Sequence, residues 1–469
     1  MTTRLMPKTQ VMPWCDHIKA TVSLGLPLIG SHLAQMATNT TDVVMLGWYG
    51  VEELAATVLA TQLWFVIFIV GSGFAFAVMP MVANALGEDD NTSVRRSVRM
   101  GLWITVIYCS AAMIPLWFFE SILLALGQQP KLAALAQDYM QIAMWAMFPA
   151  MLIMVLRSYL AALERTQIVL WATVAGAVAN GFMDYAFIFG HWGAPELGVQ
   201  GAALATIGTT LLSFAFLLGY AAWHADLKKY KLFQRFWRSD WPAFFNVFRL
   251  GWPISLTLLA ETGMFAAVSI MMGWVGTIAL ATHGIVQQIV AISFMIPLGL
   301  SNVATIRAGR AFGRKDSIGL WRASITVLLS ALLTSVCTVV LFLTLPGHLL
   351  RLFLDTAEPD FPYIIAYGAS LLAIAAAFQV FDAMQVIVLG LLRGIKDTAI
   401  PMVLAVISYW LIGVPVGYLL GFNYDYGGIG IWSGLVIGLG FAAITMGIRY
   451  YQRLQIMQKY LPTASNGHI

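Results

Sequence analysis

The feature that most constrains this 469-residue chain is an internal repeat. Residues 25–90 align without a gap on residues 251–316, at a constant offset of 226, and 16 of the 66 aligned pairs are identical. Pro27 and Pro253 form one of these pairs. Roughly five identities would be expected by chance between two apolar segments of this kind. The chain is therefore a tandem duplication, and a doubled apolar chain is typical of transporters whose substrate site lies between two similar bundles.

The composition indicates that most of the chain lies in lipid. Hydrophobic residues make up 60%, charged residues 10%, and the mean hydropathy is +0.80. A soluble fold of this composition would expose too much apolar surface. Twelve apolar runs are long enough to cross a ~30 Å hydrocarbon core, and runs of this length are expected to be helices. They begin near residues 21, 54, 98, 132, 168, 197, 250, 278, 321, 362, 400 and 428. We therefore predict an all-α integral membrane protein with six spans in each half.

The basic residues predict how these spans are oriented, because short cytoplasmic loops concentrate Lys and Arg. With a cytoplasmic N-terminus, 24 of the 26 basic residues fall on the cytoplasmic side, beginning with Arg4 and Lys8. Only Lys131 and Arg351 fall outside. Because each half has an even number of spans, both halves enter the membrane in the same direction.

The repeat and this topology together predict two parallel, pseudo-symmetric six-helix bundles. The N-lobe covers residues 1–223, the C-lobe covers 250–469, and a basic cytoplasmic linker at 224–249 joins them. The net charge of +4 is then a topology signal that also suits anionic lipid headgroups, and it does not indicate nucleic-acid binding. The three cysteines form no recognisable disulfide framework.

Acidic side chains inside the predicted spans are the main functional candidates, because a charge within the membrane is costly. In the first span a polar stripe recurs at helical spacing, and it comprises Gln35, Thr38, Asn39 and Asp42. In the fifth span Gly176, Asn180 and Asp184 repeat every four residues, so they share one face that admits close helix approach. We predict that Asp42, Asn180 and Asp184 form a cation site in the N-lobe.

The C-lobe carries its acids at different positions. Glu261 aligns with Gln35, whereas the residue that aligns with Asp42 is Val268. Asp382 lies in the tenth span, and the uncharged polar side chains of this lobe include Thr257, Gln288, Gln379 and Gln385. No Lys or Arg is expected deep enough to pair with these acids, so their neutral form, an inorganic cation such as Na⁺ or a cationic solute must balance the charge. The alternative for each acid is a structural role, in which it bonds a neighbouring helix.

Other motifs are interpreted as structural. Stripes of glycine at four-residue spacing on the last two spans predict close helix packing, and they comprise Gly413, Gly417 and Gly421, then Gly430, Gly434 and Gly438. Pro27 and Pro253 are either hinges or tolerated kinks. His283 is expected to be structural.

Several motifs carry a resemblance to a known family. They are Thr41-Asp42 with Gly47, Ala83-Asn84-Ala85-Leu86-Gly87, Asn180 with Asp184, Gly198-Val199-Gln200-Gly201-Ala202-Ala203, Glu261 and Asp382. Together they resemble the multidrug and toxic compound extrusion (MATE) family, in particular its NorM-like branch, over nearly the whole chain.

The resemblance implies an antiporter that exports organic cations or other amphipathic compounds in exchange for Na⁺ or H⁺, by rocking-type alternating access. We further predict a monomer in the inner (plasma) membrane, in contact with membrane lipids and without a cofactor. The distribution of basic residues predicts that both termini are cytoplasmic. Ion coupling is then expected at Glu261 and Asp382 in the C-lobe, and at Asp42, Asn180 and Asp184 in the N-lobe.

Two alternatives come from other functional classes. A lipid-linked oligosaccharide flippase shares the broader superfamily plan, but its anionic diphosphate substrate would favour arginines in the cavity. A membrane-embedded enzyme would need a catalytic motif, and the sequence contains neither H-E-x-x-H nor G-x-S-x-G. We therefore predict a transporter and not an enzyme.

Overall fold

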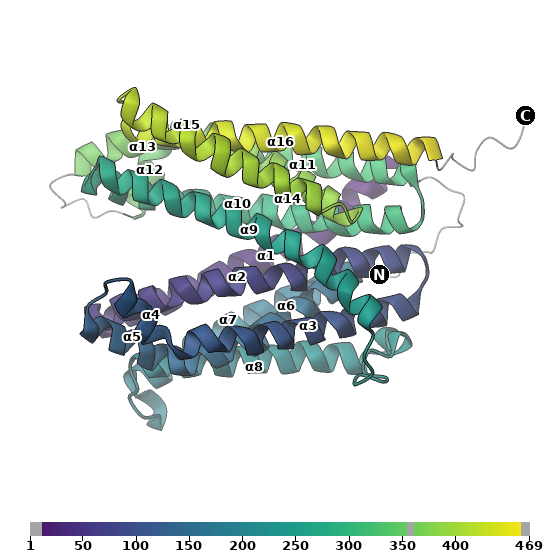
Figure 1. Cartoon of the computed structure of the whole chain (residues 1–469), viewed down its shortest axis with the longest axis horizontal. Helices are drawn as coiled ribbons and strands as arrows, with labels where there is room; N and C mark the ends of the chain where they lie inside the picture. Colours follow the sequence, from purple (N-terminus) through teal and green to yellow (C-terminus); the bar gives the residue numbers. More distant parts are fainter. Residues whose placement is uncertain (1–11, 354–360, 461–469) are drawn as a thin grey trace, which may run out of the picture. The chain divides into compact units, whose positions relative to one another are not determined.

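The computed structural model describes residues 12–353 and 361–460, and side chains at 51, 52 and 460 are not described (Figure 1). Within these residues every regular element is helical, which confirms the predicted all-α fold. Eleven of the described helical segments are long and apolar enough to cross a membrane. The first predicted span is helical as well, although it is not among these eleven. Arg4 and Lys8, which entered the topology prediction, lie outside the described residues.

The first half of the chain contains eight α-helices. They are α1 (Trp14–Tyr49), α2 (Val51–Gly87), α3 (Asn91–Trp117), α4 (Phe119–Ala125), α5 (Pro130–Ala143), α6 (Met147–Ala162), α7 (Thr166–Phe189) and α8 (Val199–Trp223). Short 3₁₀ segments are η1 (Met144–Ala146), η2 (His191–Gly193) and η3 (Ala225–Tyr230).

The second half repeats this order. Its α-helices are α9 (Trp241–Val275), α10 (Thr277–Gly313), α11 (Ser317–Thr344), α12 (Pro346–Arg351), α13 (Phe361–Gly394), α14 (Ala399–Val406), α15 (Val414–Tyr418) and α16 (Gly427–Tyr460). Two π-helical segments flank α15, namely η4 (Ile407–Gly413) and η5 (Leu419–Asn423).

The repeat extends to the local backbone. The second helix of each half ends in the same turn, with a left-handed residue at Asp89 and at Lys315, both at φ 58°. The next residue, Asp90 or Asp316, then caps the following helix by accepting hydrogen bonds from its first-turn amides. An aspartate at this position satisfies amides that the helix itself leaves unpaired. The alignment at offset 226 therefore corresponds to a repeated structural unit.

The described chain forms two compact units whose boundaries fall inside α1 and α9. One unit is Gly30–Leu259, and the other combines the start of α1 with the chain from Ala260 onward. In the second unit a Cβ added at Gly299 on α10 would lie 2.9 Å from the amide nitrogen of Ile29. In the first, a Cβ at the equivalent Gly73 on α2 would lie 2.4 Å from the amide nitrogen of Ser255. The initial half of each first helix therefore packs closely on the second helix of the other half of the sequence.

Each unit is a helix bundle (Figure 1). In the unit Gly30–Leu259, α2 packs on α3 and α6, and α7 packs on α8. In the other unit α13 lies between α10, α11 and α16. The predicted lobes at 1–223 and 250–469 follow the sequence repeat and stay a prediction. The predicted linker contains η3, and its last residues belong to α9, which already begins at Trp241.

The eleventh predicted span is irregular for identifiable reasons. Pro415 has no amide hydrogen, and its ring would collide with the carbonyl four residues earlier in a regular helix. The wider turns of η4 and η5 lie on both sides of it. On α16, a Cβ at Gly434 would lie 2.3 Å from the Cα of Gly417. The glycine stripes therefore bring two backbones into contact, which confirms the predicted close packing.

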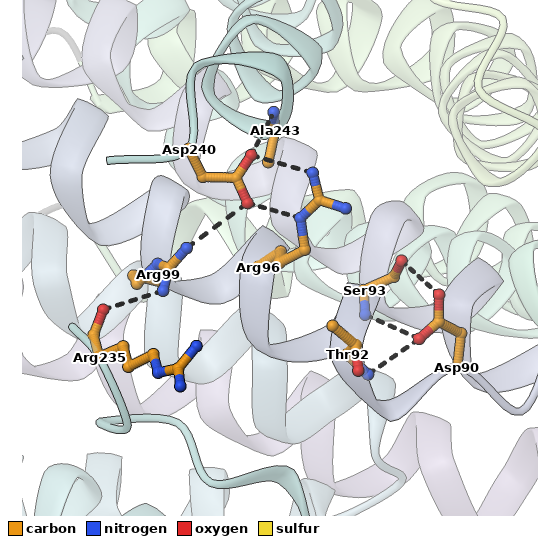
Figure 2. Close-up of polar contacts among 8 residues, drawn as sticks. All are labelled: Asp90, Thr92, Ser93, Arg96, Arg99, Arg235, Asp240 and Ala243. Carbon is orange, nitrogen blue, oxygen red and sulfur yellow. Dashed lines mark hydrogen bonds and ion pairs between the residues drawn. The ribbon is translucent and has the colours of Figure 1, made fainter. Parts of the chain in front are cut away.

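The linker is fixed to α3 by polar contacts (Figure 2). The Arg96 side chain donates two hydrogen bonds to Asp240, through Nε at 2.5 Å and Nη2 at 2.9 Å. Arg99 donates to the Arg235 carbonyl at 3.0 Å and also contacts Asp240 at 3.5 Å. The hydrogen bonds from Arg96 hold the pKa of Asp240 below its ordinary value. The basic end of α3 therefore binds the segment that precedes α9.

Candidate functional site

The first candidate site joins α1, α7 and α8 in the unit Gly30–Leu259. The amide nitrogen Nδ2 of Asn180 donates a hydrogen bond to Oδ1 of Asp42 and another to Oδ2 of Asp184, each at 2.5 Å. Because both carboxylates accept from a single nitrogen, they lie next to one another. The structure therefore brings together the three residues that the sequence predicts for the N-lobe.

Burial makes this pair of acids unusual. Asp184 is fully buried and Asn180 is 3% exposed, while Asp42 is partly exposed. Oδ1 of Asp184 has no hydrogen-bond partner within the described residues. A buried carboxylate oxygen without a partner is costly unless a proton, a cation or a water molecule meets it. Oδ1 of Asp184 is therefore the atom of this site that a proton or a cation would satisfy.

Two further residues of the site were missed by sequence reasoning. The Thr209 hydroxyl on α8 lies 2.8 Å from Oδ1 of Asn180, and the Tyr139 ring on α5 is 7% exposed and in electrostatic range of both acids. Tyr139 belongs to a buried apolar cluster that also contains Ile188 and Ala203. The acids therefore adjoin a water-poor core. Neither Thr209 nor Tyr139 stands out in its span, because isolated hydroxyls are common in helices.

The second candidate site lies in the other unit, on α9 and α13. Asp382 is 2% exposed and Glu261 is partly exposed, and their carboxylates are close enough for electrostatic repulsion. Gln379 and Gln385, one turn to either side of Asp382, are also buried. Within the described residues Oδ1 of Asp382, Oε1 of Gln379 and both terminal amide atoms of Gln385 lack a hydrogen-bond partner. This group can offer oxygen ligands to a cation.

One basic residue acts on these acids from the end of its helix, although no ion pair joins it to them within the described residues. Arg393 lies in the last turn of α13, and it interacts electrostatically with Glu261. Tyr409 on η4 is fully buried and lies in electrostatic range of Glu261, Asp382 and Arg393. The topology prediction counted Arg393 among the 24 basic residues of the cytoplasmic side, and the structure places it in the last turn of α13, which continues to Gly394.

The remaining predicted polar residues do not join either group directly. Gln35 and Asn39 are exposed, Thr38 bonds the Ala34 carbonyl of its own helix at 3.0 Å, and Gln288 is partly buried on α10. Thr257 likewise donates to the Pro253 carbonyl of α9 at 2.8 Å. Of the polar stripe in the first span, only Asp42 enters the hydrogen-bonded cluster.

Other side chains have structural roles. His283 accepts a hydrogen bond from Nε1 of Trp432 at 3.2 Å, and its other ring nitrogen lies 3.1 Å from the Ser269 hydroxyl. Both ring nitrogens of His283 are therefore satisfied, as expected for a structural histidine. The described residues contain no group of three or more His, Cys, Asp or Glu side chains arranged to hold a metal ion.

Comparison with known proteins places the chain in a family. The family model described as MatE matches twice, over residues 27–186 and 253–419. The chain belongs to the MatE family. The starting points of the two matches, 253 and 27, differ by 226, which is the offset of the internal repeat. The resemblance to the MATE family is thereby confirmed, and the chain is a multi-pass membrane protein and not an enzyme.

Two relatives show how close the similarity is. Proteins called probable multidrug resistance protein NorM from Rhizobium meliloti (strain 1021) and Agrobacterium fabrum are each 48% identical to the chain. The first alignment covers 94% of this chain and 95% of the relative, and the second covers 93% and 94%. The outward-facing structure of a multidrug resistance MATE family transporter has the same fold, with a TM-score of 0.86, 21% identity and coverage of 94% and 97%.

Proposed function

We propose that this protein is a secondary active multidrug efflux antiporter, which exports organic cations or amphipathic toxic compounds in exchange for Na⁺ or H⁺. The MatE family and the NorM relatives support multidrug efflux. The proposal of a coupling ion and of an exchange step is based on the two groups of acidic residues. The single observation that carries them is a buried carboxylate oxygen in each group, on Asp184 and on Asp382, that has no hydrogen-bond partner in the part of the chain that the structure describes.

The two groups have different roles in this proposal. Glu261 and Asp382 form the C-lobe coupling site, since their mutual repulsion favours binding of one cation between them. Asp42, Asn180 and Asp184 form a second cation site in the N-lobe. A cationic substrate and the coupling ion compete for the same negative charge, so binding of one favours release of the other.

The proposed mechanism is rocking-type alternating access between two parallel lobes. The protein acts as a monomer in the inner membrane, and both termini are cytoplasmic because the basic residues gather on that side. The orientation can be tested by cysteine labelling in a variant without the three native cysteines. Cysteines at exposed Glu88 and Arg314 should be labelled only from the cytoplasm, and one at Thr277 only from outside. Opposite labelling of Glu88 and Arg314 would contradict the parallel arrangement.

The decisive experiment uses proteoliposomes that contain the purified protein and a fluorescent organic cation. A sodium gradient at equal pH and a pH gradient at equal sodium are imposed separately. We expect one of the two gradients to drive the dye against its own concentration gradient. If neither gradient moves the dye, the antiport proposal fails. Transport of a lipid-linked oligosaccharide instead would favour the flippase.

A further inference from the structure

Unpartnered polar atoms gather along α13 and η4, beyond the acids already described. Within the described residues, the side-chain atoms that are buried and lack a hydrogen-bond partner include Nε and Nη2 of Arg393 and the hydroxyl of Tyr409. Native structures rarely leave such atoms unsatisfied without a functional reason. Two nitrogens of the Arg393 guanidinium are the most costly of these atoms to leave without a hydrogen bond, because arginine keeps its charge at any accessible pH.

The position of Arg393 on its helix relates it to the acid site. Residues of an α-helix advance by about 100° each, so Arg393, eleven residues after Asp382, lies about 20° from it around the axis. The guanidinium therefore follows Asp382 on one face of α13, about three turns nearer the end of the helix. Gln379 and Gln385 occupy the same side.

The eleventh span, which contains Tyr409, contacts α9 next to Glu261. The indole Nε1 of Trp410 donates a hydrogen bond of 3.1 Å to the carbonyl of Ala260, the residue before Glu261. A Cβ at Gly263 would lie 2.8 Å from the Trp410 ring, so this glycine allows η4 to approach α9. Tyr409, next to Trp410, is fully buried and lies in electrostatic range of Glu261.

Electrostatic interactions connect Arg393 to the acid site. Glu261 is an acid in electrostatic range of Arg393, and Tyr409 is in electrostatic range of both. We propose that Arg393 is a positioning residue that acts as an internal counter-charge for Glu261 and competes with a monovalent cation for this carboxylate. The inference rests on the proposed C-lobe site and adds a residue to it.

This competition has a measurable consequence. One positive charge near an anionic site weakens the binding of a second cation, and a change of about 1.4 kcal/mol corresponds to a tenfold change in affinity. Replacing Arg393 by a neutral residue should therefore lower the dissociation constant for Na⁺ about tenfold. A residue with a purely structural role would leave the affinity unchanged or weaken it when lost.

The test measures equilibrium binding of radioactive Na⁺ to the purified protein at fixed pH, with wild type compared with Arg393→Gln and Arg393→Lys. Arg393→Gln should bind Na⁺ about tenfold more tightly, and Arg393→Lys, which keeps the charge, should stay within about twofold of wild type. Arg449→Gln is the matched control, because Arg449 pairs with Asp397, which Arg453 also contacts.

Unchanged or weaker Na⁺ binding by a folded Arg393→Gln protein would overturn the inference, as would absence of Na⁺ binding in both wild type and variant. If Arg393→Gln does not fold, a dissociation constant for Arg393→Lys that matches wild type supports the charge argument, and weaker binding by at least tenfold refutes it. These outcomes are separate from the dye assay, in which loss of all gradient-driven transport in wild type defeats the proposed antiport itself.

Discussion

The Thr209 hydroxyl on α8 meets the amide oxygen of Asn180 on α7 at 2.8 Å. Because the amide nitrogen of Asn180 is engaged by two carboxylates, its oxygen must face away from them, and Thr209 meets it there. The Thr209 hydroxyl also contacts the Ala205 carbonyl of its own helix at 2.6 Å, so its one hydrogen is shared between the two oxygens. Thr209→Val keeps the shape and removes this partner of the buried Asn180 oxygen, at a cost of about 1–3 kcal/mol. We expect slower dye efflux by about fivefold or more, while Thr209→Ser stays near wild type. Equal rates for Val and Ser would remove Thr209 from the site.

The contribution of each lobe can be separated with near-isosteric variants. Glu261→Gln and Asp382→Asn should each reduce gradient-driven export at least tenfold, because they remove the charge that holds the coupling cation. Asp42→Asn should also impair efflux, and all three should remain folded because each change is nearly isosteric and removes a charge from a predicted span. Export is measured in proteoliposomes beside expression and size-exclusion profiles. Wild-type transport by the Glu261→Gln/Asp382→Asn double variant would show that the C-lobe assignment is wrong.

The fold was largely predictable because the repeat and the apolar runs can be recognised directly from the order of the residues. The offset of 226 anticipates that α2 and α10 begin and end at equivalent positions. The packing of each initial half-helix on the other half of the sequence was not predictable, since it depends on contacts such as Gly299 with Ile29. The wide turns around Pro415 were also not predicted, because a proline alone does not specify how a helix adjusts.

The site residues were predictable only where their type of side chain is rare in a membrane span. Carboxylates such as Asp184 stand out in an apolar helix, and helical spacing connects Asp184 to Asn180. Spacing cannot show which helices are neighbours, so Thr209 and Tyr409 were missed. The electrostatic relation of Arg393 to Glu261 was not predicted, because hydropathy marks the apolar core of a helix and not its end.

The linker contact between Arg96 and Asp240 predicts a pH dependence of stability. The pKa of Asp240 is lowered by the hydrogen bonds from Arg96, so its contribution to folding is present above the ordinary carboxyl pKa of about 3.9 and is lost as pH falls through the lowered value. At neutral pH Asp240→Asn should lower stability by about 1 kcal/mol, discounted because Arg96 is 41% exposed.

This difference can be measured as a thermal unfolding midpoint in detergent. The gap between wild type and Asp240→Asn should be constant from pH 8 to pH 5 and close only below about pH 4. Asp226→Asn serves as the control, because the Arg165–Asp226 pair is exposed and should contribute little. A gap that closes already between pH 7 and pH 5 would mean that another group controls this contact.

The glycine contact between α15 and α16 predicts a strong and specific packing defect. A Cβ at Gly434 would lie 2.3 Å from both the Cα and the amide nitrogen of Gly417, so no side-chain rotation relieves the clash and the two helices must separate. Gly447 lies on the same helix, and a Cβ there would meet nothing within 4 Å. Gly447→Ala should therefore be neutral or stabilise by about 0.5–1 kcal/mol, since alanine favours the helix. Gly434→Ala should reduce the yield of monodisperse protein and lower the unfolding midpoint. A Gly434→Ala protein as stable as Gly447→Ala would contradict the backbone contact.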